Sequence, residues 1–407
     1  MENGLLSKYF KGIVAKKLSQ VEVNPQVSNQ HEFNGINEFK SILGSGKSTY
    51  EGVFIYLADD EETILNEAGS LTWYNAREND PKRNEFRLYY STTQIMEKAN
   101  VGDFLLIGLT HDNKLAVVVA PTGTTAEQQL LWLFEIGEIG NKFIFRDISS
   151  NDIKLNFAGK YILNSLGFEI DETKPDFLNL ILNTFGDQFP STAIFSDFAR
   201  STVDNVSAIE EPDKTLIAWL EREEILFKTL EKHIVSKKLE QGFGENKIDV
   251  DDFISFSLSV QNRRKSRAGF AFENHLASIF KFQEISFSKG AKTERNNKPD
   301  FLFPSIINYH DPSFPVELLT MLGVKTTAKD RWRQVLSEAE RITSQKHLIT
   351  LEPAISVNQT DEMFAQNLQL VIPQSLKETF TASQQSNLLN LQEFINVVRQ
   401  RQNKIVN

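Results

Sequence analysis

Two short apolar runs in the C-terminal half of the chain each carry one charged side chain at an end. Asp300 opens the run Phe301–Phe303, and Lys325 closes a second run that includes Leu322. Short continuous apolar runs are typical of strands buried inside a sheet. When two such strands are neighbours, an acid on one and a lysine at the end of the other can hold a divalent metal ion beside a water molecule. This chemistry requires both runs to lie in one sheet.

A further acid, Glu338, lies in the stretch Lys329–Ile342, which has helical spacing. Sites of this kind usually place an acid two residues before the lysine, but Gly323 occupies that position here. On the predicted helix, Arg331, Val335 and Glu338 share one face because they follow each other at helical spacing. Glu338 is therefore predicted to supply the missing carboxylate from the helix.

Together these residues suit phosphodiester hydrolysis. That reaction needs a metal ion that stabilises developing charge and acidifies a water, and a cation near the phosphorus. Asp300 and Glu338 are predicted to bind Mg²⁺, which prefers oxygen ligands and keeps several waters. Lys325 is predicted to orient the nucleophile and to steady the phosphate. The alternative is that these side chains form ordinary surface salt bridges.

A block of cations stands just before another acid, Glu273, which lies in the helical stretch Gly269–Phe280. Residues 256–300 carry nine Lys or Arg against four Asp or Glu, although the whole chain has a net charge of −10. Arginine pairs with guanine edges, and a basic patch attracts phosphates. The block therefore predicts a DNA-binding segment, with a plain solvated surface as the alternative. Its members are Arg263, Arg264, Lys265 and Arg267.

The chain divides by pattern into two parts. Residues 1–165 contain β-branched or aromatic runs separated by turn residues, which predicts a mostly-β barrel or pseudobarrel. Alternating helical stretches and apolar strands follow, and they predict an α/β domain with a mixed central sheet. We expect domains at 1–170 and 189–407, with an acidic linker at 171–188. The expected strands include 52–57, 86–90, 104–109, 114–119, 347–351 and 369–372, and the expected helices include 126–137, 192–201, 214–238, 250–260 and 376–401.

A charged ladder begins one of the N-terminal strands. Because side chains alternate along a strand, Arg83, Glu85 and Arg87 should share one face. Arginine can read guanine and glutamate can accept from cytosine, so this face could bind DNA bases. A solvated ladder of ion pairs is the plainer alternative, and spacing alone favours it.

A phosphate-loop motif is imitated by Gly44–Thr49. The motif needs a glycine where this chain has Ser41, and it needs a helix where the chain predicts the strand 52–57. A turn is therefore favoured over a nucleotide site.

Composition excludes several other classes of protein. The chain has no cysteine, so disulfides, thiolate zinc sites and cysteine nucleophiles are absent. The six histidines show no metal-binding spacing, and Tyr309-His310-Asp311 has no nucleophile to activate. No apolar run approaches the ~20 residues of a membrane span, and the start lacks the plan of a signal peptide. A cytoplasmic protein that does not engage membranes is expected.

Several longer blocks resemble one known family, the two-domain EcoRII-type restriction endonucleases of the PD-(D/E)xK nuclease group. The resemblance is densest over residues 255–345 and weaker in the N-terminal part. It implies a restriction-endonuclease-like core that dimerises through the C-terminal domain and cuts double-stranded DNA at a short site containing CCWGG. It also implies a cognate DNA methyltransferase in the same system. The blocks are Asn262–Gly269, Lys298–Ser305, Tyr309–Asp311, Phe314–Glu317, Val324–Thr327 and Lys329–Gln334, with Lys17–Ser19 and Arg83–Arg87.

The family likeness also assigns roles to individual residues. Asp300, Lys325 and Glu338 match catalytic or metal-binding positions, and Mg²⁺ is the implied cofactor. Glu273 is implied as a further acid, with Tyr309 and Arg331 in supporting catalytic roles. In the family, an N-terminal pseudobarrel binds a second copy of the site and otherwise covers the catalytic cleft. The matching DNA contacts of that effector domain are His31, Arg83, Glu85 and Arg87.

This chain departs from the family pattern at two places in the effector domain. The loop before His31 is Val27-Ser28-Asn29-Gln30 where the family has glycines, and Phe86 replaces a basic residue. Three functions follow as hypotheses. The first is a Mg²⁺-dependent type II restriction endonuclease with an allosteric effector domain. The others are a non-catalytic, sequence-specific DNA-binding regulator on a nuclease fold, and a DNA-repair or structure-specific nuclease, which would leave the Arg/Glu/Arg ladder unexplained.

Overall fold

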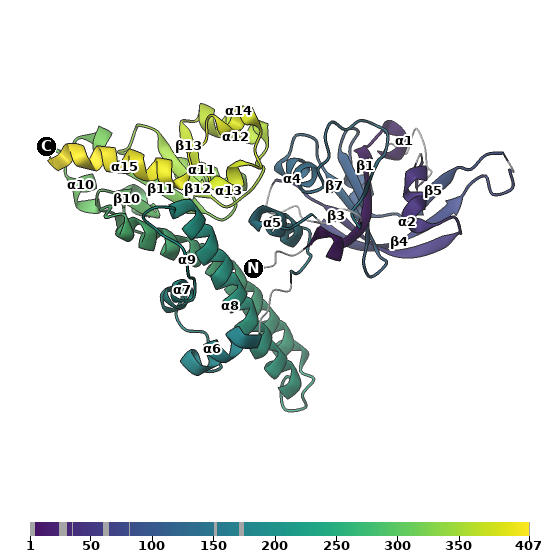
Figure 1. Ribbon diagram of the computed structural model, residues 1–407, viewed down its shortest axis with the longest axis horizontal. Helices are drawn as coiled ribbons and strands as arrows, with labels where there is room; N and C mark the ends of the chain where they lie inside the picture. The colour runs from purple at the N-terminus through teal and green to yellow at the C-terminus, as the bar shows by residue number, and fades with distance from the viewer. Residues whose placement is uncertain are drawn as a thin grey trace. The chain divides into compact units, whose positions relative to one another are not determined.

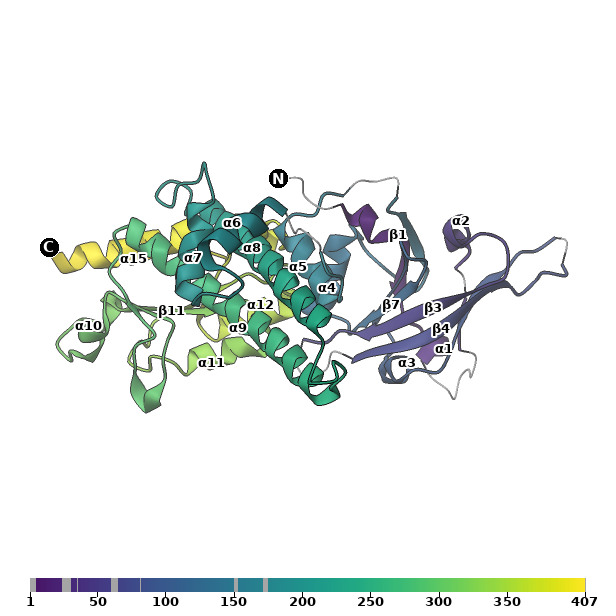
Figure 2. The ribbon, with the colours of Figure 1, turned by 90° about the horizontal axis from the view of Figure 1, so that it is seen from below.

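The computed structural model describes residues 5–23, 31–34, 36–59, 65–80, 82–149, 153–170 and 175–406. The chain forms two compact units. Unit 1 is Met1–Ile170 with Pro353–Asp361, and unit 2 is Asp171–Glu352 with Glu362–Asn407. Figures 1 and 2 show unit 1 as mainly sheet and unit 2 as a sheet with long helices. Within the described ranges, no helix is both long enough and apolar enough to cross a membrane.

Unit 1 is built on one mixed sheet of eight strands in the order β2-β5-β4-β3-β7-β6-β1-β8. Neighbouring strands are antiparallel except β3 and β7, which are parallel. All four strands predicted in this region are present, while β1, β2, β4 and β8 were not predicted. The strands are β1 (Phe10–Lys17), β2 (Glu32–Phe33), β3 (Ser48–Tyr56), β4 (Leu65–Asn75), β5 (Phe86–Tyr90), β6 (Phe104–Thr110), β7 (Leu115–Ala120) and β8 (Ile144–Asp147).

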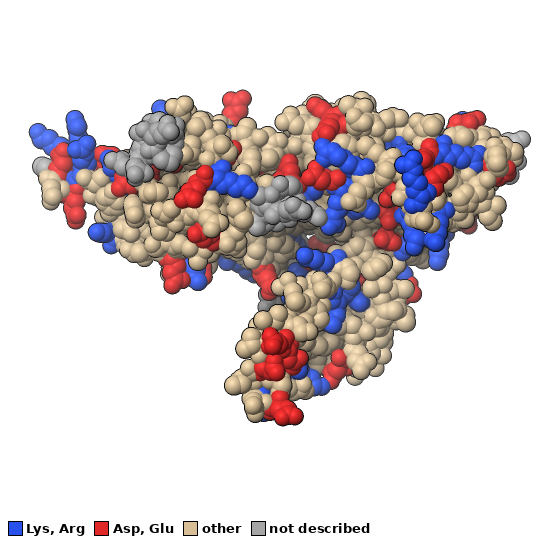
Figure 3. Space-filling view, turned by 180° about the vertical axis from the view of Figure 1, so that it is seen from behind, with Lys and Arg blue, Asp and Glu red and all other residues tan. Residues whose placement is uncertain are grey.

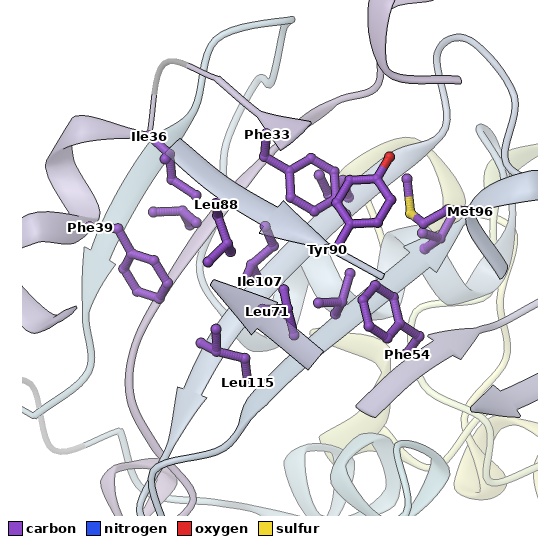
Figure 4. Packing of buried hydrophobic residues seen from close by; sticks show 14 of the residues in the cluster. Phe33, Ile36, Phe39, Phe54, Leu71, Leu88, Tyr90, Met96, Ile107 and Leu115 are labelled. Atoms are coloured by element: carbon purple, nitrogen blue, oxygen red, sulfur yellow. The ribbon is translucent and has the colours of Figure 1, made fainter. Parts of the chain in front are cut away.

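Both faces of this sheet are buried along β6 and β7. On β7, Leu115 and Val117 pack into one core, whereas Ala116 and Val118 pack into the other, because successive side chains point to opposite faces. The first core contains Phe33 and other residues that Figure 4 shows converging on the sheet. The second core is covered by α4 and α5. The helices are α1 (Gln20–Val23), α2 (Lys40–Leu43), α3 (Gln94–Lys98), α4 (Thr125–Leu133) and α5 (Phe157–Ser165), with short 3₁₀ turns at Leu6–Lys8 and Asn37–Phe39.

The mixed α/β class and the curled mixed sheet agree with the prediction, and the closure of unit 1 into a pseudobarrel stays a prediction. The sequence that imitates a phosphate loop is a turn. Gly44 has a φ of 82° after α2, and the strand β3 begins at Ser48. No helix follows the turn to present its N-terminus to a phosphate.

Unit 2 surrounds a sheet of five strands in the order β13-β12-β11-β10-β9. β10 is antiparallel to β9 and β11, while β11, β12 and β13 are parallel. The two apolar runs that carry Asp300 and Lys325 are therefore neighbours, as predicted. The strands are β9 (Ser288–Lys289), β10 (Phe301–Phe303), β11 (Thr320–Lys325), β12 (Lys346–Thr350) and β13 (Leu368–Val371).

Long helices pack beside this sheet. The ring of Phe280 on α9 contacts Phe301 and Phe303 edge-on, at centroid distances of 5.2 and 5.3 Å. Figure 1 shows α8 and α9 as the two longest helices of the unit. The helices are α6 (Pro175–Phe185), α7 (Thr192–Ser201), α8 (Pro212–Gln241), α9 (Val250–Phe282), α10 (Ile306–His310), α11 (Trp332–Leu336), α13 (Gln374–Lys377), α14 (Ala382–Gln385) and α15 (Leu391–Val406), with 3₁₀ turns at Glu294–Asn296, Val316–Leu318 and Lys329–Arg331. The helix α12 (Val357–Ala365) begins in the segment assigned to unit 1 and ends in unit 2.

The helices differ from the expected pattern in three segments of unit 2. The expected linker 171–188 is largely helix, because α6 buries Ile181 against Leu226 and Leu230 of α8; residues 171–174 lie outside the described ranges. The stretches 250–260 and 269–280 form one continuous helix, α9, since nothing between them breaks a helix. The expected helix 376–401 is three shorter helices, α13, α14 and α15.

Asp213 joins the start of α8 to the end of the chain. Its Oδ1 accepts the backbone N–H groups of Gln374 and Leu391, both at 2.9 Å. Its Oδ2 accepts the N–H of Gln392 at 3.0 Å. The N-termini of α13 and α15 thus have their unpaired donors satisfied by one buried side chain.

Replacing Asp213 with Ala should destabilise unit 2 by about 2–3 kcal/mol, because it removes charge-assisted caps from two helices at once. Chemical denaturation of the wild type and the variant would measure the loss. Asp197→Ala is a suitable control, since Asp197 is exposed and pairs with an arginine on its own helix. Equal stability of Asp213→Ala and wild type would contradict the capping role.

Candidate active site

The register of β10 against β11 brings the predicted acid and lysine together. Phe301 pairs with Leu322, so Asp300 lies opposite the end of β11. Asp300 Oδ2 accepts the backbone N–H of Val324 at 2.6 Å and the Lys325 Nζ at 3.3 Å. Both side chains are mostly shielded, with exposed fractions of 17% and 19%. The lysine therefore faces the carboxylate in a partly dry setting, where their attraction exceeds that of an exposed pair.

Gly323 explains why the usual acid is missing from β11. A Cβ placed on Gly323 would lie 2.8 Å from Cγ2 of Val335, which is fully buried on α11. Contacts this short force a neighbour to move. The close packing of α11 on β11 therefore leaves no room for a carboxylate at this position.

Glu338 lies beside the pair, although not on a helix as predicted. The helix α11 ends at Leu336, and Ala339 then adopts a φ of 49°. Positive φ in a residue other than glycine is uncommon, and the sequence gives no glycine or asparagine signal for it. The proposed helical face of Arg331, Val335 and Glu338 is therefore wrong, and a turn carries the acid.

The carboxyl of Glu338 is the most perturbed acid of the site. Burial, assisted by the negative charge of Asp300 and opposed by the Lys325 ammonium, raises its pKa to about 7. Its Oε2 is buried and has no hydrogen-bond partner among the residues that the structure describes. Buried polar atoms nearly always have a partner. An unpaired carboxylate oxygen near Asp300 fits a position that a cation would fill.

Glu273 of α9 also faces the site. Burial raises the pKa of its carboxyl, and Asp300 adds to the effect while Lys289 opposes it. The Lys289 Nζ lies 3.2 Å from Glu273 Oε2 and 3.1 Å from the side-chain oxygen of Asn274. The analysis of the sequence missed Lys289, which lies on β9 opposite Phe301. No local sequence pattern indicates that these two lysines and three acids meet, because the residues come from separate elements of the fold.

Two carboxylates, Asp300 and Glu338, could hold a magnesium ion here. No group of three or more His, Asp or Glu side chains with metal-binding geometry occurs among the described residues. Mg²⁺ does not require one, since it is commonly held by one or two carboxylates with waters and substrate phosphates completing an octahedron. The hard oxygen donors and the unpaired Glu338 oxygen fit this ion.

Tyr309 and Arg331 are placed differently. Tyr309 is 1% exposed, and its hydroxyl donates to Glu294 at 2.6 Å and accepts the Arg341 backbone N–H at 3.1 Å. Burial, followed by the bond to Glu294, raises the pKa of Tyr309. A supporting role of Tyr309 would therefore be indirect, through the segments of Glu294 and Arg341 that its hydroxyl joins. Arg331 is exposed on the 3₁₀ turn that follows Lys325.

The cation block 263–267 lies within α9 and is partly turned inward. Arg264 Nε donates to the buried Glu231 at 2.6 Å. The guanidinium of Arg267 is buried among phenylalanine rings, 4.4 Å from the centroid of Phe195. Arg267 is thus buried within unit 2, and the DNA contact predicted for it stays a prediction. Arg263 is half-buried and Lys265 is exposed.

The predicted DNA-binding ladder of unit 1 forms a network of ion pairs. Arg87 donates from Nη1 to Glu32 at 3.0 Å and from Nη2 to Glu85 at 2.6 Å. Glu85 also accepts Arg77 Nε at 3.1 Å, and these arginine hydrogen bonds lower the pKa of Glu85. Sequence spacing did not identify Arg77 or Glu32, which come from outside the ladder.

Arg83 and His31, the other two residues predicted to contact DNA in unit 1, lie apart from this network of ion pairs. Arg83 is exposed and precedes β5, so it does not continue the strand face as predicted. The His31 ring packs edge-on against Tyr90 at 5.6 Å, while the loop 27–30 before it lies outside the described residues. Figure 3 shows Lys and Arg interspersed with Asp and Glu over one face of the molecule.

Comparisons with known proteins concern mainly the C-terminal part. Residues 227–395 match a family model described as EcoRII C terminal. The type II restriction enzyme EcoRII of Escherichia coli is 43% identical over 209 residues, which is 51% of this chain and 50% of that protein. The match thus spans about half the length of that relative. The acids and lysines of the site lie within the family-model range.

Solved structures give a weaker likeness. Metal-depleted Ecl18kI in complex with uncleaved, modified DNA aligns at 18% identity with a TM-score of 0.45, covering 56% of this chain and 84% of that chain. Metal-depleted Ecl18kI with uncleaved DNA aligns over the same shares at 18% identity with a TM-score of 0.44.

The raised pKa of Glu338 predicts a pH-dependent stability. Between its ordinary value of 4.5 and about 7, the unfolded chain releases this proton while the folded chain keeps it. The free energy of unfolding should therefore fall as pH rises through this window. Glu338→Gln cannot ionise, so it should stabilise the metal-free protein more at about pH 8 than at about pH 4. Melting temperatures across this range test the effect, and a difference independent of pH would contradict it.

Proposed function

We propose that this chain, whose residues 227–395 match the EcoRII C-terminal family model, is a type II restriction endonuclease that hydrolyses phosphodiester bonds of double-stranded DNA. The observation that carries the proposal is the meeting of Asp300 and Lys325 across β10 and β11, with Glu338 buried beside them. A protein that only binds DNA has no need of a half-buried lysine aimed at two acids, and this argues against the regulator alternative.

In this proposal Asp300 and Glu338 hold Mg²⁺. When bound, that ion would stabilise charge on the phosphate and lower the pKa of a coordinated water. Lys325 would hold the attacking water or a phosphate oxygen, and its position is set by its contact with Asp300. Glu273, kept close by Lys289, would add a further acceptor for water. The half-buried setting of these side chains strengthens each charge interaction.

The finer elements of the proposal concern DNA and partners. We infer a recognition site of CCWGG or a related sequence, a homodimer joined through the C-terminal domain, and a cognate methyltransferase. Unit 1 would bind a second copy of the site and relieve autoinhibition, with Arg87 at the centre of its DNA contacts. Arg87 is held by two carboxylates, so DNA binding must replace or reuse those bonds. Digestion of unmethylated plasmid DNA with Mg²⁺, followed by sequencing of the ends, tests the activity and the site.

Replacing Lys325 with Ala should reduce cleavage by at least roughly 10²–10³-fold, because a cation that stabilises the transition state is lost. Specific DNA binding should persist, since base contacts lie on other residues. Single-turnover cleavage and equilibrium binding of the same duplex separate the two effects. Robust cutting by this variant, or by wild type in a chelator, would exclude the assigned centre.

Autoinhibition predicts that wild type cuts a single-site plasmid slowly and is stimulated by an oligonucleotide carrying the site. Only a difference in affinity between the two states can produce this response, and couplings of this type are roughly 5–150-fold. Arg87→Ala should abolish the stimulation while leaving the chemistry intact. Arg146→Ala is the control, because Arg146 lies on β8 at the other edge of the same sheet. Equal stimulation of both variants would remove Arg87 from the effector site.

A further inference from the structure

The turn that carries Glu338 has an unusual backbone. It links the end of α11 to β12, and its first bonds are from the Glu338 N–H to Val335 O at 3.2 Å and from the Ile342 N–H to Ala339 O at 2.9 Å. Ala339 is fully buried at a φ of 49°, a conformation that persists only where the surroundings enforce it. Something besides the local sequence must hold this turn in place.

Lys346 at the start of β12 supplies the main hold. Its side chain is almost entirely buried, and its Nζ donates to Leu336 O at 2.6 Å and also to Glu338 O. Cationic side chains near a helix C-terminus satisfy its last carbonyl groups. Here the same ammonium spans the end of α11 and the residue that bears the catalytic carboxylate.

Asn297, in the segment that leads from the 3₁₀ turn Glu294–Asn296 to Asp300 and β10, provides a second anchor. Its Nδ2 donates to Ser337 O at 2.9 Å. The three successive carbonyl groups of Leu336, Ser337 and Glu338 are therefore each held by a side-chain N–H. Because Asn297 lies three positions before Asp300, it ties the two acids of the site to one another through the backbone.

We propose that Lys346 and Asn297 are positioning residues that hold the Glu338 turn at the distance from Asp300 that a shared Mg²⁺ requires. The proposal rests on the proposed nuclease function and extends it to two residues that do not touch the metal. A buried ammonium is costly unless its partners are fixed. Groups that orient metal ligands typically contribute 10–100-fold to metal affinity or activity.

The test compares Lys346→Met with Lys377→Met in the full chain. Lys377 is a matched control, since its Nζ also donates to a backbone carbonyl of unit 2, that of Leu388 at 2.9 Å, but it belongs to α13. Lys346→Met should raise the Mg²⁺ concentration for half-maximal cleavage by roughly 10–100-fold. Its affinity for the duplex without metal should be unchanged. Lys377→Met should keep the wild-type Mg²⁺ requirement.

Asn297→Ala keeps the proposal testable if Lys346→Met does not fold. It should raise the Mg²⁺ requirement in the same direction and keep metal-free DNA binding. A second measurement needs no cleavage: Ca²⁺ should raise the melting temperature of wild type, and both variants should need more Ca²⁺ for the same rise. A wild-type metal requirement in both variants would overturn the proposal. Absence of cleavage by wild type, with its Ca²⁺ response intact, would instead overturn the proposed function alone.

Discussion

The antiparallel pairing of β10 with β11 is the constraint on which the site depends. Just past the end of the ladder, the Val324 N–H donates to the side-chain carboxylate of Asp300 and fixes the acid relative to Lys325. A shift by one residue would move Lys325 to the opposite face of the sheet. The apolar runs on both strands prevent such a shift, because Phe301 and Phe303 must remain against Phe280. Hydrophobic packing thus sets the geometry of the charged groups.

Packing also explains why Glu338, and not a residue of β11, supplies an acid beside Asp300 and Lys325. Val335 lies so close to Gly323 that β11 cannot carry a side chain at that position. The helix α11, which carries Val335, is followed directly by the turn that holds Glu338, so the acid lies just past the C-terminus of that helix. The exchange makes the position of the acid depend on tertiary contacts of that turn, whereas an acid on β11 would be placed by the strand itself.

The sequence predicted what local pattern determines. Strands β3, β5, β6 and β7 of the first sheet, β10 to β13 of the second, and the meeting of Asp300 with Lys325 followed from apolar runs, whereas β1, β2, β4, β8 and β9 were not predicted. The resemblance to EcoRII-type enzymes is confirmed over residues 227–395. The end of α11 was not predictable, because a left-handed alanine has no sequence signature. The burial of Arg267 depends on phenylalanines from other helices, and the exposed Arg264 is held by the buried Glu231. Lys289 and Lys346 gave no signal, since their roles arise only from folding.

The charge balance of the site gives a physical reason for a metal. Burial raises the pKa of both Glu273 and Glu338, and the charge of Asp300 raises each of them further. Two lysines offset part of this repulsion, but Lys289 is engaged by Glu273 and Lys325 by Asp300. Glu338 is left with no cation of its own in direct contact among the described residues. A proton can neutralise it below about pH 7, whereas the proposed divalent cation would do so at higher pH and lower the pKa of Glu338. Protons and metal must then compete for one carboxylate, which links the electrostatics of the folded chain directly to its proposed chemistry.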